Sequence, residues 1–232
     1  MKKKILCVVL AKKNSKGLPN KNMKLLLGKP LIWYTFDAIK KSKIFDRVIL
    51  SSDSIKIINF ARKMNIEAPF VRPKKYSSHR SSALDALRHS LDWILKNDQR
   101  YDYVQYIFPT NPLINSSDIK NGLKNIIKFK SDMVISVCKS REFKNNLNFL
   151  KKGASLKNFI PKKFRFLNRQ SYPPSYKIDG CIYIAKWDVW YFKKDWFSIK
   201  TKAIIRSVYR SIDINDKLDF EIAKILLKKK YK

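Results

Sequence analysis

The sequence predicts an α/β protein in which helices cover both faces of a mainly parallel sheet. Short apolar runs alternate along the chain with longer segments whose apolar residues recur at helical spacing. The runs at 5–11 and 103–108 are almost continuously apolar, as strands buried on both faces are. Hydrophobic residues make up 45% of the 232 residues, which is enough for a packed core.

The first quarter of the chain is predicted to contribute two strands, each followed by a helix. The run 5–11 follows a lysine-rich start, as in a signal peptide, but it lacks a small-x-small cleavage site and ends in two lysines. A buried strand therefore fits it better. Pro30 suits the first turn of the first helix. Residues 47–51 form the second predicted strand, and Asp53 and Ser54 can cap the helix after it.

The alternation continues through the middle of the chain and then stops. The predicted elements are a short strand at 68–72, a helix at 82–96, a strand at 103–108, a helix capped by Ser116 or Ser117, and a strand at 133–137. From about 139 to 180 no steady period remains. A strand at 181–185 and a helix at 216–229 complete the pattern. We expect a single domain over 1–232 with an inserted subdomain at about 139–180.

The formal charge of +33 arises from 51 Lys and Arg residues against 18 Asp and Glu residues. A basic surface attracts phosphate-rich partners such as nucleic acids. Lys greatly outnumbers Arg, however, and is spread along the whole chain, whereas a dedicated binding element tends to concentrate its charge. Lys has A/T-rich codons, so genome-wide drift towards A/T-rich codons is the favoured explanation of the high positive charge. We expect nucleic acid to bind only weakly and nonspecifically.

The cysteine and histidine content bears on metal sites and location. Three widely spaced cysteines and two histidines give no zinc-type ligand spacing. Reduced thiols packed as small hydrophobic side chains are typical of cytoplasmic proteins. No stretch approaches the ~18–20 apolar residues of a membrane-spanning helix. The sequence therefore predicts a soluble, cytoplasmic protein with no membrane partner.

Ligands of open α/β sheets bind at the carboxyl ends of the strands, so the residues there are candidates for function. The first strand is followed by a loop with four lysines, Ser15 and Gly17, which suits phosphate binding but matches neither the P-loop nor the dinucleotide motif. Thr110 and Asn111 follow a later strand, and Asp213 precedes the last helix. By themselves the lysines are better explained as a solvated loop and Asp213 as a helix cap, and Thr110 and Asn111 could be only a turn.

The order of the residues adds a resemblance to a known family. The segment from Leu10 to Asn22 closely resembles the nucleotide-binding motif of the cytidylyltransferases that activate acylneuraminate (sialic) acids. Further segments look like later landmarks of that family, in the same order: 45–53, 71–73, 109–113, 169–174, 180–184, 211–214 and 218–219. They extend over about residues 5–226. The resemblance implies a Rossmann-like sheet of the nucleotidyltransferase type A kind with a small dimerisation insert.

The implied reaction joins CMP from CTP to the anomeric hydroxyl of a nine-carbon 2-keto sugar acid and releases pyrophosphate. The resemblance implies Mg²⁺ as cofactor and a role in surface glycan biosynthesis, in lipopolysaccharide or capsule. The family includes enzymes for legionaminic and pseudaminic acid. An eight-carbon substrate of the Kdo type is less expected, because the Asn14–Gly17 loop and the Ser211–Ile214 ending resemble the nine-carbon branch more.

The resemblance also implies roles for individual residues. The implied catalytic residues are Lys16, Lys21 and Asp213. Those near the nucleotide are Leu10, Ala11, Lys12, Asn14, Ser15, Gly17, Asn22, Arg72, Ser81 and Ser82. Those near the sugar are Phe108, Thr110, Asn111, Arg169, Gln170, Lys177 and Tyr183. Asp213 and Asn215 would hold Mg²⁺. A homodimer formed through the insert would bring Arg169 close to a partner's active site.

Several positions depart from the family's usual pattern. They are Lys12, Ile114 and Lys177 in place of Arg, Phe108 in place of Gln, the pair His79-Arg80 in place of Asp-Thr, and Asn215 in place of Asp. Three interpretations remain open: ordinary drift, a related sugar acid as substrate, or an impaired enzyme. We favour an active enzyme with altered or relaxed sugar preference. The alternative is an impaired family member that acts as a basic nucleic-acid- or polyanion-binding protein.

Overall fold

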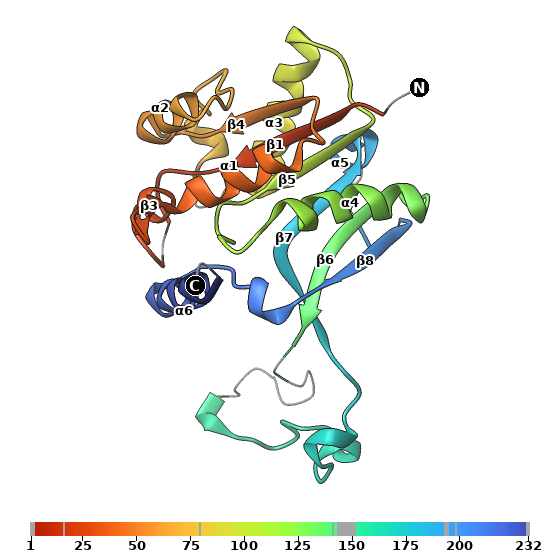
Figure 1. Ribbon diagram of the computed structural model, residues 1–232. Coiled ribbons are helices and arrows are strands. Elements are labelled where there is room, and N and C mark those ends of the chain that lie inside the picture. Colours follow the sequence, from red (N-terminus) through yellow and green to blue (C-terminus); the bar gives the residue numbers. More distant parts are fainter. Residues whose placement is uncertain are drawn as a thin grey trace.

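The computed structural model describes residues 3–15, 17–78, 80–140, 142, 152–192, 195–197 and 199–230. At its centre lies a six-stranded sheet in the order β4-β1-β5-β7-β6-β8 (Figure 1). The strands are β1 (Ile5–Leu10), β4 (Arg47–Ser51), β5 (Tyr103–Ile107), β6 (Met133–Lys139), β7 (Tyr176–Lys186) and β8 (Thr201–Arg206). A separate hairpin joins β2 (Leu25–Leu26) to β3 (Lys29–Pro30).

The strand directions confirm the mainly parallel sheet. β1 is parallel to both β4 and β5, and β6 is parallel to β8. β7 is the exception, because it is antiparallel to β5 on one side and to β6 on the other. All six residues of β1 are buried, which explains why this strand is continuously apolar in the sequence.

Helices cover both faces of the sheet, as predicted. They are α1 (Leu31–Ser42), α2 (Ile55–Lys63), α3 (Ala83–Asn97), α4 (Ser116–Lys128), α5 (Trp187–Phe192) and α6 (Lys217–Lys230). The side chains of α1, α2 and α4 share one core cluster, whereas those of α3 and α5 share another on the opposite face (Figure 1). Trp190 of α5 is fully buried in the second cluster and donates its indole N–H to the carbonyl of Val104.

A third, smaller core cluster joins the last helix to the loop after β1. Ile214 and Phe220 pack there with Leu18, Leu26 and Leu31. Ile214 belongs to residues 211–216, which we call the closing segment because they connect the last strand region to α6. The cluster therefore brings the end of the chain against its first loop, at the carboxyl ends of the parallel strands.

Two details of the expected secondary structure are wrong. Instead of a strand at 68–72, the structure has two isolated bridges, which pair Glu67 with Ile49 and Val71 with Ser52. Pro69 lies between them and has no N–H to donate, so a continuous ladder does not form. The N-cap of α4 is Asn115 rather than Ser116 or Ser117. Its side chain accepts a hydrogen bond from Asp118 N at 2.9 Å, and the Asp118 carboxylate accepts one from Asn115 N in return.

The segment expected as an insert lies between β6 and β7, whose ends pair at Lys139 and Tyr176. Its described part projects away from the sheet and contains three short 3-10 turns, Lys152–Ala154, Lys162–Phe164 and Arg169–Ser171 (Figure 1). Large apolar side chains are exposed on it, with Phe166 at 95%. Elsewhere the three cysteines are buried and free. Across the described ranges, the helices fall short of the length and apolarity needed to span a membrane.

Candidate active site

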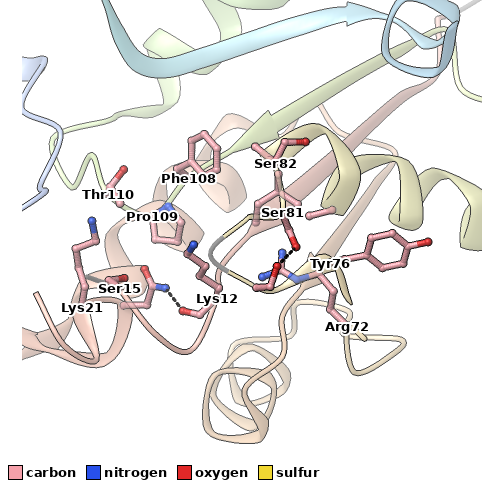
Figure 2. Close-up of a pocket in the computed structure, with 15 residues that line it drawn as sticks. Lys12, Ser15, Lys21, Arg72, Tyr76, Ser81, Ser82, Phe108, Pro109 and Thr110 are labelled. Carbon is pink, nitrogen blue, oxygen red and sulfur yellow. Dashed lines mark hydrogen bonds between the residues drawn. The ribbon is translucent and has the colours of Figure 1, made fainter. Parts of the chain in front are cut away.

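A cleft opens at the carboxyl ends of β1 and β5 (Figure 2). Ten of the predicted site residues line it: Leu10, Lys12, Ser15, Lys21, Asn22, Arg72, Ser81, Ser82, Phe108 and Thr110. They come from four separate stretches of the chain. The fold therefore brings together most of the residues predicted to bind the nucleotide and part of those predicted to bind the sugar.

The loop after β1 is held in place by hydrogen bonds from its own side chains and neighbours. Asn22 donates from Nδ2 to the carbonyl of Lys12 at 2.9 Å. Lys13 N donates to the Asp53 carboxylate at 2.7 Å. Asn20 has a φ of 52°, a left-handed conformation that Asn tolerates better than most residues. The loop thus directs the side chains of Lys12 and Lys21 towards the β5 side of the cleft (Figure 2).

The same loop packs closely against the closing segment at Gly17. A Cβ atom at Gly17 would lie 2.2 Å from the carbonyl oxygen of Asn215, so no larger residue fits without a shift. Leu18, the next residue, is buried in the cluster that includes Ile214. The absence of a side chain at Gly17 therefore allows the lysine-rich loop and the acidic closing segment to lie side by side.

Lys21 connects these two parts of the site directly. It is 8% exposed, and its ammonium group donates a hydrogen bond to the carbonyl oxygen of Ile214. Burial lowers the pKa of Lys21, while the nearby carboxylates of Asp213 and Asp219 oppose this effect and Lys12 adds to it. An anionic ligand in the cleft would offset the cost of burying this charge.

The opposite wall combines a buried guanidinium with hydroxyl groups. Arg72 is 4% exposed and donates from Nε to Ser77 Oγ at 2.9 Å. Burial lowers its pKa, and Asp53, 3.8 Å away, opposes this effect. Ser82 caps α3 in a capping box with Asp85. Because Ser82 also lines the cleft, the N-terminus of α3 lies at the cleft. Helix N-termini and guanidinium groups both favour phosphate oxygens.

Asp213 and Asn215 line a second hollow next to the cleft, together with Lys177 and Asp219. Asn215 donates from Nδ2 to a carboxylate oxygen of Asp213 at 3.3 Å and to its carbonyl at 3.2 Å. Ile214, between them, donates its N–H to the carbonyl of Thr110 at 2.8 Å. The closing segment is therefore bonded to both sides of the cleft, through Lys21 and through Thr110.

The donor set at the closing segment fits Mg²⁺ bound together with a triphosphate. Among the described residues, no group of three or more His, Cys, Asp or Glu side chains could hold a metal ion. Asp213 supplies a carboxylate, and the neighbouring Asn215, whose amide nitrogen donates to that carboxylate, carries an amide oxygen that could serve as a second ligand. Mg²⁺ commonly takes one or two carboxylates and completes its shell with phosphate oxygens and water. These two residues could therefore hold Mg²⁺ only as part of a larger shell.

Three aromatic side chains, Phe108, Tyr106 and Tyr183, form a cluster next to Thr110 that we call the aromatic wall, and of the three only Phe108 lines the cleft itself. Tyr183 stacks on Tyr106 with ring centroids 4.8 Å apart, and Phe108 lies edge-on to both rings. Burial, with Asp179 and Asp213 nearby, raises the pKa of Tyr183 to about 12, so its hydroxyl stays protonated at neutral pH. Phe108 thus gives the cleft an aromatic surface beside Thr110, whereas Tyr183, predicted to lie near the sugar, packs against Phe108 without lining the cleft.

The structure places other predicted residues away from the cleft surface. Asn111 is 1% exposed, and neither end of its side-chain amide has a hydrogen-bond partner in the described part of the chain. Asn14 is exposed on the loop, Ala11 is buried at the end of β1, and Gln170 is exposed on the insert. Lys16 and the side chain of Arg169 lie outside the described residues. Tyr76 and Ser78 line the cleft but were not predicted, although they lie between the predicted Arg72 and Ser81.

Comparison with known proteins agrees with this arrangement. A family model described as cytidylyltransferase matches residues 6–228. The pseudaminic acid cytidylyltransferase of Campylobacter jejuni subsp. jejuni serotype O:23/36 (strain 81-176) is 30% identical, over 97% of each chain. The N-acylneuraminate cytidylyltransferase of Escherichia coli O18:K1:H7 is 29% identical, over 99% of this chain and 54% of that one.

A solved structure shows the same fold at much lower sequence identity. The CMP:2-keto-3-deoxy-manno-octonic acid synthetase complexed with CTP matches with a TM-score of 0.71 and 14% identity, over 98% of this chain and 99% of that chain. The family match extends over almost the entire sequence, and the fold agrees with it. This chain belongs to the cytidylyltransferase family.

Proposed function

We propose that this protein joins CMP from CTP to the anomeric hydroxyl of a nine-carbon 2-keto sugar acid and releases pyrophosphate. The observation that carries the proposal is the contact between the cationic cleft and the acidic closing segment through Lys21. A nucleotidyl transfer needs cations around the phosphates and a carboxylate for the metal at one place. The relatives named for pseudaminic acid and N-acylneuraminate support a sugar acid of this kind as acceptor.

In this proposal the cations of the cleft hold the triphosphate. Lys12, Lys21 and Arg72 neutralise phosphate oxygens, and Lys16 adds a further cation from the same loop. As the anomeric hydroxyl attacks the α-phosphorus and pyrophosphate leaves, negative charge grows on these oxygens. Cations that are already oriented stabilise that charge without reorganisation. No covalent intermediate with the protein is required.

Asp213 and Asn215 would hold the Mg²⁺, which would supply positive charge to offset the negative charge that develops on the phosphate oxygens. The Asp213 carboxylate also lies close enough to the aromatic wall to influence the pKa of Tyr183. We propose that it additionally orients the sugar hydroxyl and accepts its proton. Asn215 offers an amide oxygen instead of a second carboxylate, so the metal would be bound more weakly than by two Asp residues.

The sugar is proposed to lie between the aromatic wall and Lys177. Thr110 contributes a hydroxyl, and Phe108 and Tyr183 contribute apolar ring surface. Lys177, in the hollow with Asp213, offers a cation to the sugar carboxylate. Arg169 and Gln170 lie on the insert and would reach this region from a partner subunit. The large exposed side chains on the insert, such as Phe166, support a homodimer formed through it.

Pyrophosphate release from CTP and Mg²⁺ with a panel of neuraminic, pseudaminic and legionaminic acids tests the proposal. Release with one sugar assigns both reaction and acceptor. If none of the three sugars gives pyrophosphate release, while a related enzyme assayed in parallel is active, these sugars are not the acceptors. The alternative of a polyanion-binding protein is less favoured, since the family match is extensive. It predicts binding that weakens steeply with salt and does not distinguish CTP from ATP.

A further inference from the structure

A buried ionic network lies directly behind the closing segment. At its centre is the carboxylate of Asp179 in β7, which is 3% exposed. It accepts hydrogen bonds from Arg206 Nη1 at 2.6 Å, Ser211 Oγ at 2.8 Å and Cys181 N at 3.2 Å, and a fourth from Ser136 Oγ. A carboxylate has about four acceptor sites, so Asp179 is fully occupied by these donors.

Arg206 of β8 extends the network to the next helix. Its Nη2 donates to the Asp118 carboxylate in α4 at 3.1 Å and to the carbonyl of Arg210 at 2.9 Å. The guanidinium of Arg210 also lies 3.2 Å from Asp118. Two guanidinium groups therefore face two carboxylates, and the side chains of Arg206 and Asp118 are each 3% exposed. Such a charge-balanced network keeps its geometry because any lost partner leaves a buried charge unpaired.

The network reaches Asp213 by two routes. Ser211 carries the hydrogen bond from the closing segment to Asp179 and lies two residues before Asp213. Gly180, next to Asp179 in β7, has a φ of 72°, and a Cβ atom there would lie 3.6 Å from the Asp213 carboxylate. Asp179 thus fixes both the backbone that carries Asp213 and the surface against which its carboxylate lies.

We propose that Arg206 is a positioning residue for the Asp213 carboxylate and acts through Asp179 and Ser211. The inference rests on the metal role proposed above for Asp213. Groups behind a metal ligand orient it, and their loss typically lowers metal affinity about 10- to 100-fold. Apolar residues of similar volume are often at least as stabilising as buried charges of this kind. A role in orienting Asp213 therefore gives the network a function that apolar packing would not provide.

The variant that changes the structure least is Ser211→Ala, which removes one hydroxyl group from the network. Ser42→Ala is a matched control, because Ser42 is 1% exposed, donates from Oγ to the carbonyl of Ile39 at 2.7 Å, and ends α1 away from the cleft. CTP binding is measured by calorimetry with Mg²⁺ and with EDTA, and thermal unfolding is followed in parallel. Arg206→Lys, which loses the fork that bridges two carboxylates, is measured in the same way.

We expect Ser211→Ala to weaken CTP binding in Mg²⁺ about tenfold more than in EDTA and to raise the apparent KM for Mg²⁺ similarly. Arg206→Lys should change in the same direction, and if it fails to fold, Ser211→Ala decides. Ser42→Ala should keep the wild-type response to Mg²⁺ even where it unfolds at a lower temperature. An unchanged Mg²⁺ response in Ser211→Ala, or an equal loss in Ser42→Ala, would overturn the inference.

Asp213→Ala separates this inference from the proposal on which it rests. If Asp213→Ala loses the Mg²⁺-dependent part of CTP affinity and Ser211→Ala keeps it, the metal role stands and the positioning role is wrong. If Asp213→Ala binds CTP with Mg²⁺ as the wild type does, the metal role of Asp213 is wrong, and the positioning inference is overturned with it.

Discussion

The ammonium group of Lys21 donates a hydrogen bond to the carbonyl oxygen of Ile214, 193 residues further along the chain. This bond joins the first loop of the sheet to the last segment before α6. It places a buried cation next to the carboxylate proposed to hold the metal. Lys21 is therefore in a position to hold the closing segment and, in the proposed function, to stabilise the phosphates at the same time.

Replacement of Lys21 by Met should abolish most turnover. The variant loses the bond to Ile214 and a cation next to the proposed phosphate site, and loss of one oriented stabilising group typically costs about 10²–10³ in kcat. Pyrophosphate release measures the effect. Lys56→Met, on the exposed surface of α2, removes the same charge elsewhere and should retain turnover. Equal activity in the two variants would exclude a role for Lys21.

The pH dependence should reveal the lowered pKa of Lys21. Burial favours the neutral amine, so Lys21 loses its proton at a lower pH than an ordinary lysine. Since the charged form is the one proposed to bind phosphate, kcat/KM for CTP should fall as the pH rises through this lowered pKa. Lys21→Arg keeps its charge at all accessible pH values, so its remaining activity should lack this alkaline decline. A wild-type profile that stays flat up to about pH 10 would contradict the assignment.

Gly17→Ala should impair the site by separating the loop from the closing segment. The added Cβ would lie 2.2 Å from the carbonyl oxygen of Asn215, which belongs to the backbone and cannot rotate away. We expect a fall of at least about tenfold in kcat/KM for CTP, as small misplacements of catalytic groups give. Gly28→Ala is the control, because a Cβ atom added at Gly28 would have no other atom within 4 Å. The backbone of Gly28 has a φ of 79°. Gly28→Ala should therefore cost about 1–2 kcal/mol of backbone strain and leave KM unchanged.

Asn215→Asp should strengthen metal binding. The variant places a second carboxylate next to Asp213, where the wild type has an amide. Because Mg²⁺ prefers charged oxygen ligands, the apparent KM for Mg²⁺ should fall several-fold, while KM for CTP at saturating Mg²⁺ changes little. Turnover over a Mg²⁺ titration checks this result. An unchanged Mg²⁺ requirement would show that residue 215 is not a metal ligand. Normal turnover of Asp213→Ala at limiting Mg²⁺ would show that Asp213 is not a metal ligand either.

The alternation of strands and helices could be predicted from the sequence because each element buries a continuous face. β1 and α3, for example, agree with the predicted ranges to within one residue. The antiparallel direction of β7 could not be predicted, since a strand buried on both faces has the same pattern in either direction. The prediction of a strand at 68–72 was wrong because it relied on the apolar pattern, whereas Pro69 lacks the N–H that a continuous hydrogen-bond ladder needs.

The site could be predicted in part, from residue order. Lys12, Arg72 and Thr110 meet at the cleft as expected. Tyr76 and Ser78 were missed because they have no distinctive spacing and reach the cleft only through the turn after Arg72. The network of Arg206 and Asp179 was also missed, because its members are up to 92 residues apart and each looks like an ordinary surface charge. Burial distinguishes them from the rest of a very basic chain.

The insert offers the last prediction, which concerns the proposed dimer. Phe166 exposes 95% of its surface on the part of the chain between β6 and β7, and such large apolar groups commonly mark contact sites. We expect light scattering to give twice the mass of one chain, and Phe166→Asp to give a larger monomer fraction. Phe197→Asp is the matched control, because Phe197 is 70% exposed outside the insert and should leave the dimer intact. If the dimer contributes Arg169 to the partner's site, Phe166→Asp should also lower turnover at low protein concentration, where subunits dissociate. Turnover independent of concentration in a dissociating variant would show that each subunit has a complete site.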